Sequence, residues 1–135
     1  MTAAIRPMVN RDSAYFWEGT LKGELRIQSC NACGVLRHPP GPACPECGAL
    51  DRGYVVASGL GTVFSYVVHR HPPVPGKELP IVIALIDLDE GVRMIGEVVG
   101  DGVAEMVAIG TRLRVDFNRV DDDLAMPIWH VEEGR

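Results

Sequence analysis

Four cysteines, arranged as two Cys-x-x-Cys pairs, constrain this chain more than any other feature of its sequence. Cys30 and Cys33 form the first pair, Cys44 and Cys47 form the second, and a glycine follows each pair directly. Tetrahedral zinc accepts four thiolate ligands, and glycine tolerates the positive φ that the turn after such a pair requires. The spacing therefore predicts a zinc ribbon with a closed, structural metal site that leaves no coordination position for water or substrate.

Other uses of the four thiols fit the rest of the chain less well. Two disulfides require an oxidising compartment, yet residues 1–10 lack the apolar segment of a signal peptide. A redox pair of the thioredoxin kind belongs near a β-α-β pattern, which this sequence does not contain. Iron stays open as an alternative to zinc, because tetrahedral sulfur coordination suits both metals. His38 lies between the pairs, and we expect it at the surface or behind the ligands because four cysteines already complete the shell.

Size and charge indicate a soluble protein with a second compact unit besides the ribbon. The chain has 135 residues, 47% of them hydrophobic, and no apolar run approaches the roughly 18 residues of a membrane span. Residues 1–58 contain six basic and five acidic side chains, against seven and thirteen in residues 59–135, so the net charge is +1 and −6. Phosphate neutralisation supplies most nucleic-acid affinity, so the acidic half argues against such a ligand. We expect a cytoplasmic protein that contacts neither membrane nor nucleic acid.

A short helix is predicted over Arg11–Lys22, ahead of the ribbon, with Asp12 as its N-cap and Gly23 as the glycine that ends it. The segment contains three consecutive aromatic residues, whose side chains point about 100° apart on a helix and cannot share one face. Part of the helix is therefore expected to bind another chain, and the alternative is that the rings cover the ribbon and barrel as a lid. The predicted partner contacts are Tyr15, Phe16, Trp17 and Leu21.

The remaining sequence is predicted to form short strands separated by turn residues, which is typical of a small Greek-key barrel. Glu24–Ser29 alternates, with Leu25 and Ile27 on one face, and is expected to lead into the first cysteine pair. The segments expected to form strands after the ribbon are Tyr54–Ala57, Thr62–His69, Ile81–Leu88, Val92–Val99, Thr111–Phe117 and Met126–Val131. Hairpin turns are expected at residues 89–91 and 121–123, and a short helix or loop over residues 101–109.

A proline-rich connection separates two of these strands. It runs over residues 71–80 and contains four prolines, which stiffen it and suit a loop that presents side chains to a ligand or partner. A plain crossover between strands is the alternative. The candidate substrate or partner contacts in and beside this loop are Arg70, His71, Pro73 and Lys77.

No catalytic motif accompanies these elements. The sequence lacks the nucleophile elbow, the zinc-protease helix motif and the glycine-rich phosphate loops. His69, His71 and His130 lie on or beside predicted strands, where a structural histidine is more common than a general base. We therefore assign no catalytic residue and expect a chain that is not an enzyme by itself.

Taken together, the motifs resemble a family of small proteins first described as a domain of unknown function and associated with acyl-CoA metabolism. The matching segments run from Phe16-Trp17-Glu18-Gly19 through both cysteine pairs to residues 59–66 and 85–91. The resemblance implies a mainly β chain with an N-terminal helix, a rubredoxin-like zinc ribbon and a C-terminal OB-fold barrel. The implied division is an arm and helix over residues 1–24, the ribbon over 25–53 and the barrel over 54–135.

The resemblance also implies a function. Members of the family are similar to accessory subunits of thiolase-superfamily enzymes, or are fused to hotdog-fold enoyl-CoA hydratases, including enzymes that remove steroid side chains. The chain is expected to be a noncatalytic subunit that binds and stabilises or activates a thiolase-like acyl-CoA aldolase or acyltransferase. Acyl-CoA is expected to be contacted at most indirectly, because an acidic barrel is a poor host for CoA phosphates. The alternatives are an independent acyl-CoA carrier and an OB-fold that binds single-stranded nucleic acid.

Overall fold

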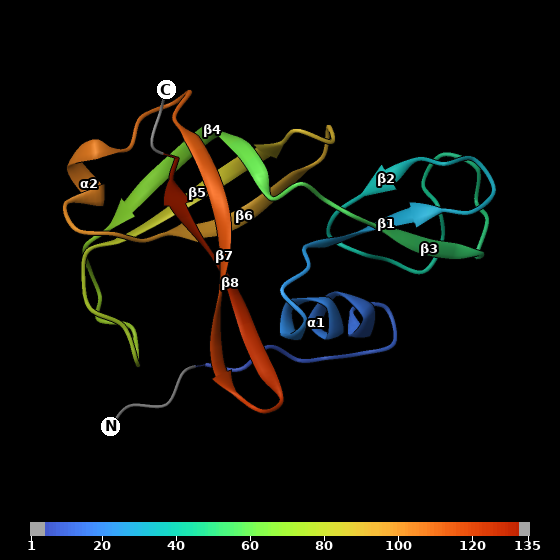
Figure 1. The fold of residues 1–135 in the computed structure, drawn as a ribbon, viewed down its shortest axis with the longest axis horizontal. Helices are drawn as coiled ribbons and strands as arrows, with labels where there is room; N and C mark the ends of the chain where they lie inside the picture. The colour runs from blue at the N-terminus through green and yellow to red at the C-terminus, as the bar shows by residue number, and fades with distance from the viewer. Residues whose placement is uncertain (1–4, 133–135) are drawn as a thin grey trace.

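The computed structural model describes residues 5–132, so the first four residues of the predicted arm and residues 133–135 lie outside the described range. Three parts are visible in Figure 1: a helix, a small three-stranded sheet at one end of the molecule, and a closed five-stranded barrel at the other. This arrangement confirms the predicted fold class of helix, ribbon and barrel. Neither of the two helices in the described range is long and apolar enough to cross a membrane.

Helix α1 spans Ala14–Leu21 and begins three residues later than predicted. Asp12 is not its N-cap, because Ser13 occupies that position. The side chain of Asn10 organises the preceding turn by accepting hydrogen bonds from the backbone N–H groups of Asp12 and Ser13, at 2.9 and 3.0 Å. Asn10 thereby holds the turn that we had assigned to the first turn of the helix.

The end of α1 is as predicted. Gly23 adopts a φ of 75°, which a residue with a Cβ rarely tolerates. The turn directs the N–H of Gly23 to the carbonyl of Thr20 at 3.1 Å and that of Glu24 to the carbonyl of Gly19 at 2.8 Å. These two bonds form a Schellman motif, which satisfies the last carbonyls of the helix.

The ribbon sheet contains three antiparallel strands in the order β2-β1-β3. Their bounds are Arg26–Cys30 for β1, Leu36–Arg37 for β2 and Arg52–Val56 for β3. The strand that we predicted over Tyr54–Ala57 as part of the barrel is therefore wrong in its placement, since β3 pairs along its whole length with β1. Its composition identified a strand, but composition carries no information about which sheet a strand joins.

The strands β4 to β8 form the barrel, with β5 matching its predicted bounds and β7 running four residues further than predicted. Their bounds are Leu60–His69, Ile81–Leu88, Arg93–Val98, Arg112–Asp121 and Leu124–Val131, and a short helix α2 spans Val103–Met106. The order around the barrel is β4-β5-β6-β8-β7, and β6 and β8 are parallel. The predicted hairpin turns after β5 and β7 are confirmed. A five-stranded barrel of this kind is typical of an OB-fold.

One contiguous apolar core joins the three parts. Trp129 of β8 is fully buried in the barrel, and Leu25, Ile27 and Phe16 contribute from the ribbon and from α1 to the same cluster. Helix α1 contacts β1 on one side and the hairpin of β7 and β8 on the other, as Figure 1 shows. The helix therefore lies between ribbon and barrel and helps to fix their relative positions.

Candidate functional site

The four cysteines converge at one end of the ribbon sheet, as the sequence predicts. Their four sulfur atoms all lie within 4.8 Å of one another. The Sγ atoms of Cys30 and Cys47 are 3.6 Å apart, as are those of Cys33 and Cys44, whereas a disulfide needs about 2 Å. Four sulfurs at about 2.3 Å from a central ion would stand slightly under 4 Å apart in a tetrahedron. The spacing suits a shared metal ion and excludes disulfides in this state.

Each cysteine pair forms the same backbone turn. The N–H of Gly34 donates to the carbonyl of Cys30 at 2.8 Å, and the N–H of Gly48 donates to the carbonyl of Cys44 at 2.9 Å. Both glycines have a positive φ, of 81° and 77°. A Cβ at either position would strain the turn, which is the reason for a glycine after each pair.

Backbone amides stabilise the thiolate form of the first cysteine in each pair. The amide of Cys33 points at Cys30 Sγ from 3.4 Å and lowers the pKa of the Cys30 thiol to about 6. The amides of Cys47 and Glu46 lower the pKa of Cys44 in the same way. The thiolate is the form that binds metal, so the turns prepare these residues as ligands. Four protein ligands would close the site, as they do in structural metal sites.

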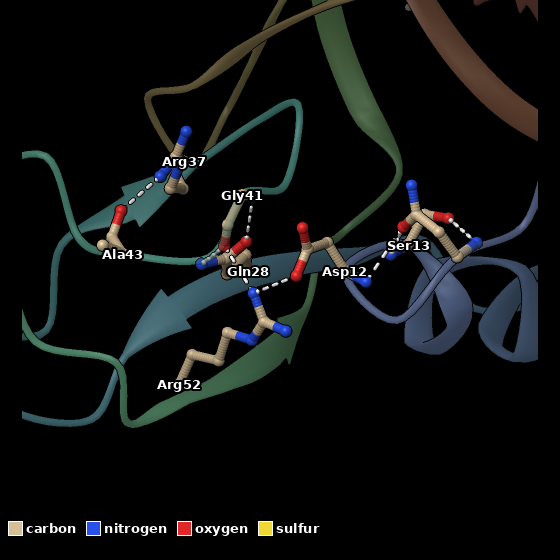
Figure 2. Close-up of polar contacts among 8 residues, drawn as sticks. Asp12, Ser13, Gln28, Arg37, Gly41, Ala43 and Arg52 are labelled. Carbon is tan, nitrogen blue, oxygen red and sulfur yellow. Dashed lines mark hydrogen bonds and ion pairs between the residues drawn. The ribbon is translucent and has the colours of Figure 1, made fainter.

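A network of polar contacts fastens the loop between the cysteine pairs to the ribbon (Figure 2). The Gln28 side chain bonds to both backbone groups of Gly41, at 2.9 and 3.0 Å. Arg52 donates to the Gly41 carbonyl at 2.6 Å and pairs with Asp12, just before α1, at 2.7 Å. Arg37 donates to the carbonyl of Ala43 at 2.6 Å. The network thus ties the start of α1 to the loop that carries the second cysteine pair.

Arg26 provides the second attachment of α1. Its guanidinium is nearly buried, pairs with Glu24 at 2.8 Å and lies 4.4 Å from the centre of the Tyr54 ring. Gly19 of α1 lies directly on this side chain, and a Cβ there would come within 2.5 Å of Arg26 Cδ. Only glycine lets the helix approach this closely, which explains a residue that otherwise disfavours helices.

The three consecutive aromatic residues of α1 point in different directions, because the helix has neighbours on two sides. Tyr15 stacks on Tyr54 of the ribbon at 5.9 Å between ring centres. Phe16 is 5% exposed and belongs to the shared core. Trp17 meets the Phe16 ring edge-on at 5.0 Å and is partly buried, as is Leu21. The assignment of these four residues to partner contacts stays a prediction. Trp17 is more exposed than Phe16 and is therefore the better candidate for such a contact.

His38 lies apart from the metal ligands. Its ring stacks at a tilt on Phe16, 5.4 Å between ring centres, and it is not part of the cysteine cluster. Burial lowers the pKa of its imidazole. We expected His38 at the surface or behind the ligands, and the structure instead places it against α1, because the turn after β2 brings it there.

A groove of about 720 Å³ opens between α1 and the barrel. Its walls come from Phe16 and Trp17 of α1, from residues 38–40 and 74–77, and from strands β5 to β8. Strand β4 contributes only its last residue, His69. Apolar side chains dominate the lining, among them Ile95 and Met126. Sequence reasoning missed this groove. Apolar residues at outward strand positions were a signal for it: Ile83, Ile95 and Val120 are exposed and line the groove.

The proline-rich loop contributes unequally to this groove. Lys77 lines it and pairs with Glu97 of β6, so the structure brings the loop and Trp17 into one surface. Arg70, His71 and Pro73 are exposed and lie outside the lining. Their role as contacts of a substrate or partner stays a prediction.

The other titratable side chains singled out in the sequence form local pairs. His69 Nε2 is 2.8 Å from the carbonyl oxygen of Pro72, and His130 lies 3.4 Å from Asp116. Asp87 accepts a hydrogen bond from Arg93 at 2.6 Å. None of these contacts joins a nucleophile to a base, which is the arrangement that catalysis by this chain would need.

Two family models match the chain. The rubredoxin-like zinc ribbon domain of ChsH2 matches residues 17–51, and the C-terminal OB-fold domain of ChsH2 matches residues 54–118. Both matches agree with the four-cysteine cluster and the barrel described above.

Three curated proteins are similar over much of the chain. A 3-oxo-4,17-pregnadiene-20-carboxyl-CoA hydratase alpha subunit of Mycobacterium tuberculosis is 48% identical over 97% of this chain. A probable enoyl-CoA hydratase alpha subunit of Thermomonospora curvata is 44% identical over 92%. The chain spans only 41% and 39% of the length of these two proteins. A DUF35 domain-containing scaffold protein of Methanocaldococcus jannaschii is 38% identical over 70% of this chain and 67% of its own length.

A solved structure is similar over nearly the whole chain. It is described as an Ltp2-ChsH2(DUF35) aldolase, and one of its chains matches with a TM-score of 0.87 and 43% identity. The match covers 93% of this chain and 98% of that chain.

Proposed function

Since this chain belongs to the DUF35 family and carries both the zinc ribbon and the OB-fold of ChsH2, we propose that it is a noncatalytic accessory subunit of an enzyme acting on acyl-CoA thioesters. The observation that carries the proposal is the likeness to a chain of the Ltp2-ChsH2(DUF35) aldolase, which extends over nearly all of both chains. A shared backbone over that length supports a shared way of binding a partner. Such a subunit contributes binding and position, whereas the partner contributes the reacting groups.

The partner that we propose is a thiolase-superfamily enzyme, an aldolase that cleaves a β-hydroxyacyl thioester or an acyltransferase. The family resemblance supports the superfamily, and the name of the similar structure favours the aldolase. The substrate in the name of the Mycobacterium tuberculosis relative, a pregnadiene carboxyl-CoA, supports a steroid side chain as the acyl group.

An enoyl-CoA hydratase of the hotdog fold is the second candidate partner. Two relatives are named as hydratase alpha subunits, and this chain corresponds to about two fifths of each of them. The remainder of those proteins would then be supplied here by a separate chain or by a further segment.

The metal in this proposal is zinc, held by the four cysteines as a structural cross-link. The donor set fits, because four sulfurs surround one point and two of the thiols are already biased towards thiolate. In this proposal the four cysteines are reduced metal ligands and not disulfides, which supports a reducing compartment such as the cytoplasm.

Assays with the separate and combined proteins test the accessory role. The chain alone should show no turnover of a β-hydroxyacyl-CoA, because it lacks a positioned nucleophile and base. A thiolase-superfamily aldolase that is its partner should gain solubility, activity or both when the two proteins are mixed or expressed together. Turnover by this chain alone, or an aldolase that is indifferent to its presence, would contradict the proposal.

A pair of neighbouring substitutions tests the contribution of α1. Trp17→Ala should weaken partner binding by about 2 kcal/mol or more while changing the melting temperature of the free chain little, because Trp17 is only partly buried. Phe16→Ala is the matched control and should mainly lower stability, because Phe16 lies in the core. Isothermal titration and thermal melts of both variants separate the two effects. Unchanged affinity of Trp17→Ala, together with a lowered melting temperature, would support the lid interpretation.

A further inference from the structure

The groove beside α1 has the dimensions and lining of a small-molecule site. Its volume of about 720 Å³ lies within the range of roughly 300–1,000 Å³ for ligand pockets. Its lining comes from α1, from residues 38–40 and 74–77 and from all five barrel strands, so several elements far apart in the sequence build one concave site.

The charged and titratable side chains in the lining leave no charge without a partner. There are four of them: Lys77 and Glu97, which pair with each other, and His38 and His69. His69 is engaged with the Pro72 carbonyl, and burial lowers the pKa of His38, which disfavours the charged form of its imidazole. A carboxylate or phosphate bound here would lose hydration without gaining a counter-charge. The lining thus selects an uncharged molecule.

One residue of the lining has a polar atom without a hydrogen-bond partner. His38 Nδ1 is buried and has no hydrogen-bond partner within the described residues. Buried polar atoms are normally bonded, so a missing partner calls for an explanation. His38 belongs to the lining of the groove, as do Trp17, Ile95 and Met126.

We propose that this groove binds an uncharged hydrophobic molecule, with His38 as the residue that recognises a hydroxyl or carbonyl group on it. In the assembly proposed above, the hydrocarbon end of the acyl thioester has this chemistry and its CoA moiety does not. That last identification rests on the proposed function, whereas binding of a neutral hydrocarbon by the isolated chain does not.

The test uses the full, metal-loaded chain, labelled at methionine methyl groups and tryptophan indoles for NMR. Met94, Met126 and Trp17 line the groove, and Met106 and Trp129 serve as internal controls outside it. Titration with 1-octanol should shift the first three signals saturably and leave the controls in place. Octanoate should bind at least about tenfold more weakly, because its charge has no partner in the groove. Equal affinity for octanoate, no saturable shift, or equal shifts of the controls would each overturn the proposal.

Substitutions locate the binding more closely. Ile95→Asp places a carboxylate in the groove and should abolish the octanol shifts, whereas Ile109→Asp, at a similarly exposed position outside the lining, should not. His38→Leu should weaken octanol binding by about three- to tenfold, the usual effect of one hydrogen bond. Octanol binding that survives Ile95→Asp would refute the site, and binding unaffected by His38→Leu would refute the role of His38. Failure of the aldolase assay with these shifts intact would count against the proposed function alone.

Discussion

The ribbon and the barrel differ in what fills their interiors. The buried polar or charged side chains of the described range are Thr20, Arg26 and Gln28, and all of them belong to α1 and the ribbon. The barrel interior is apolar and centres on Trp129. The ribbon is therefore defined by specific contacts, namely a four-cysteine cluster and hydrogen bonds to loops, and the barrel by packing.

This difference follows from size. Below about 40 residues a chain rarely buries enough apolar surface to fold without a metal or a cross-link. Residues 25–53 are in that range, and β1 is buried on both faces even though one of its faces is polar. The barrel has enough chain to bury a core of its own, so it should stand without the ribbon's metal. The two regions should consequently respond to different perturbations.

Metal removal should produce the largest difference in stability between the ribbon and the barrel. Cys44→Ser, or a chelator applied to the wild type, should unfold the ribbon, because structural zinc contributes on the order of 10 kcal/mol or more to such sites. The barrel should keep much of its β signal. NMR spectra assigned to each region would follow the two parts in one sample. Simultaneous loss of barrel signals would show that the shared core makes the regions one cooperative unit.

Trp129→Ala should affect the regions in the opposite sense. Trp129 is 0% exposed, so its truncation leaves a large cavity and should cost about 3–5 kcal/mol of barrel stability. The metal should stay bound. Denaturant unfolding combined with a zinc-release assay would measure both quantities. Val67→Ala, at a 60% exposed position on β4, is the control that should change neither.

Gly19→Ala tests the contact that joins the regions through α1. The added Cβ would meet the Arg26 side chain at 2.5 Å, and a nearly buried arginine has little room to move. We expect a loss of about 1–3 kcal/mol, as for other overpacked sites, even though alanine favours helices. Urea melts would report it. A stabilised variant would mean that Arg26 swings out freely and that the helix is held elsewhere.

Acid should have the smallest effect on the barrel, through the pair of Asp89 and Arg112. Hydrogen bonds from Arg112, at 2.8 and 2.9 Å, lower the pKa of Asp89. A lowered folded pKa means that the pair stabilises the barrel above the unfolded pKa of about 3.9, and that this contribution is lost as the pH falls through the folded value. Asp89→Asn should therefore destabilise slightly at pH 7 and converge with the wild type in acid. If the stabilities of Asp89→Asn and the wild type, measured against pH, differed by the same amount at every pH, this pair would not be the cause of the acid sensitivity.

Local patterns in the sequence predicted the elements that depend on local chemistry. The cysteine spacing predicted the convergence of the four sulfurs, Gly23 the end of α1, and the apolar run of Ile81–Leu88 the bounds of β5. Each of these features is decided within a few residues. The N-cap was missed because Asn10, two residues before the assigned Asp12, organises the turn.

Features decided by distant contacts could not be predicted in this way. β3 was assigned to the barrel because a strand pattern does not specify its neighbour. Arg26 and Gln28 alternate with Leu25 and Ile27 along the chain, and they are buried too, because α1 and the Gly41 loop cover their face of β1. The groove combines α1, the ribbon and the barrel, so no single segment contains its signal.

Trp129 and its strand β8 are synthesised after every other element described, and the barrel cannot close without them. The cysteine pairs lie close together in the sequence, so the ribbon's contacts are local and can form early, whereas β8 completes a barrel whose first strand is β4. Helix α1 packs on the hairpin of β7 and β8, so the first element described cannot complete its packing until the last one has been synthesised. A nascent chain would therefore present a finished ribbon with an open barrel, and the surface that combines all three parts would mature only in the completed molecule.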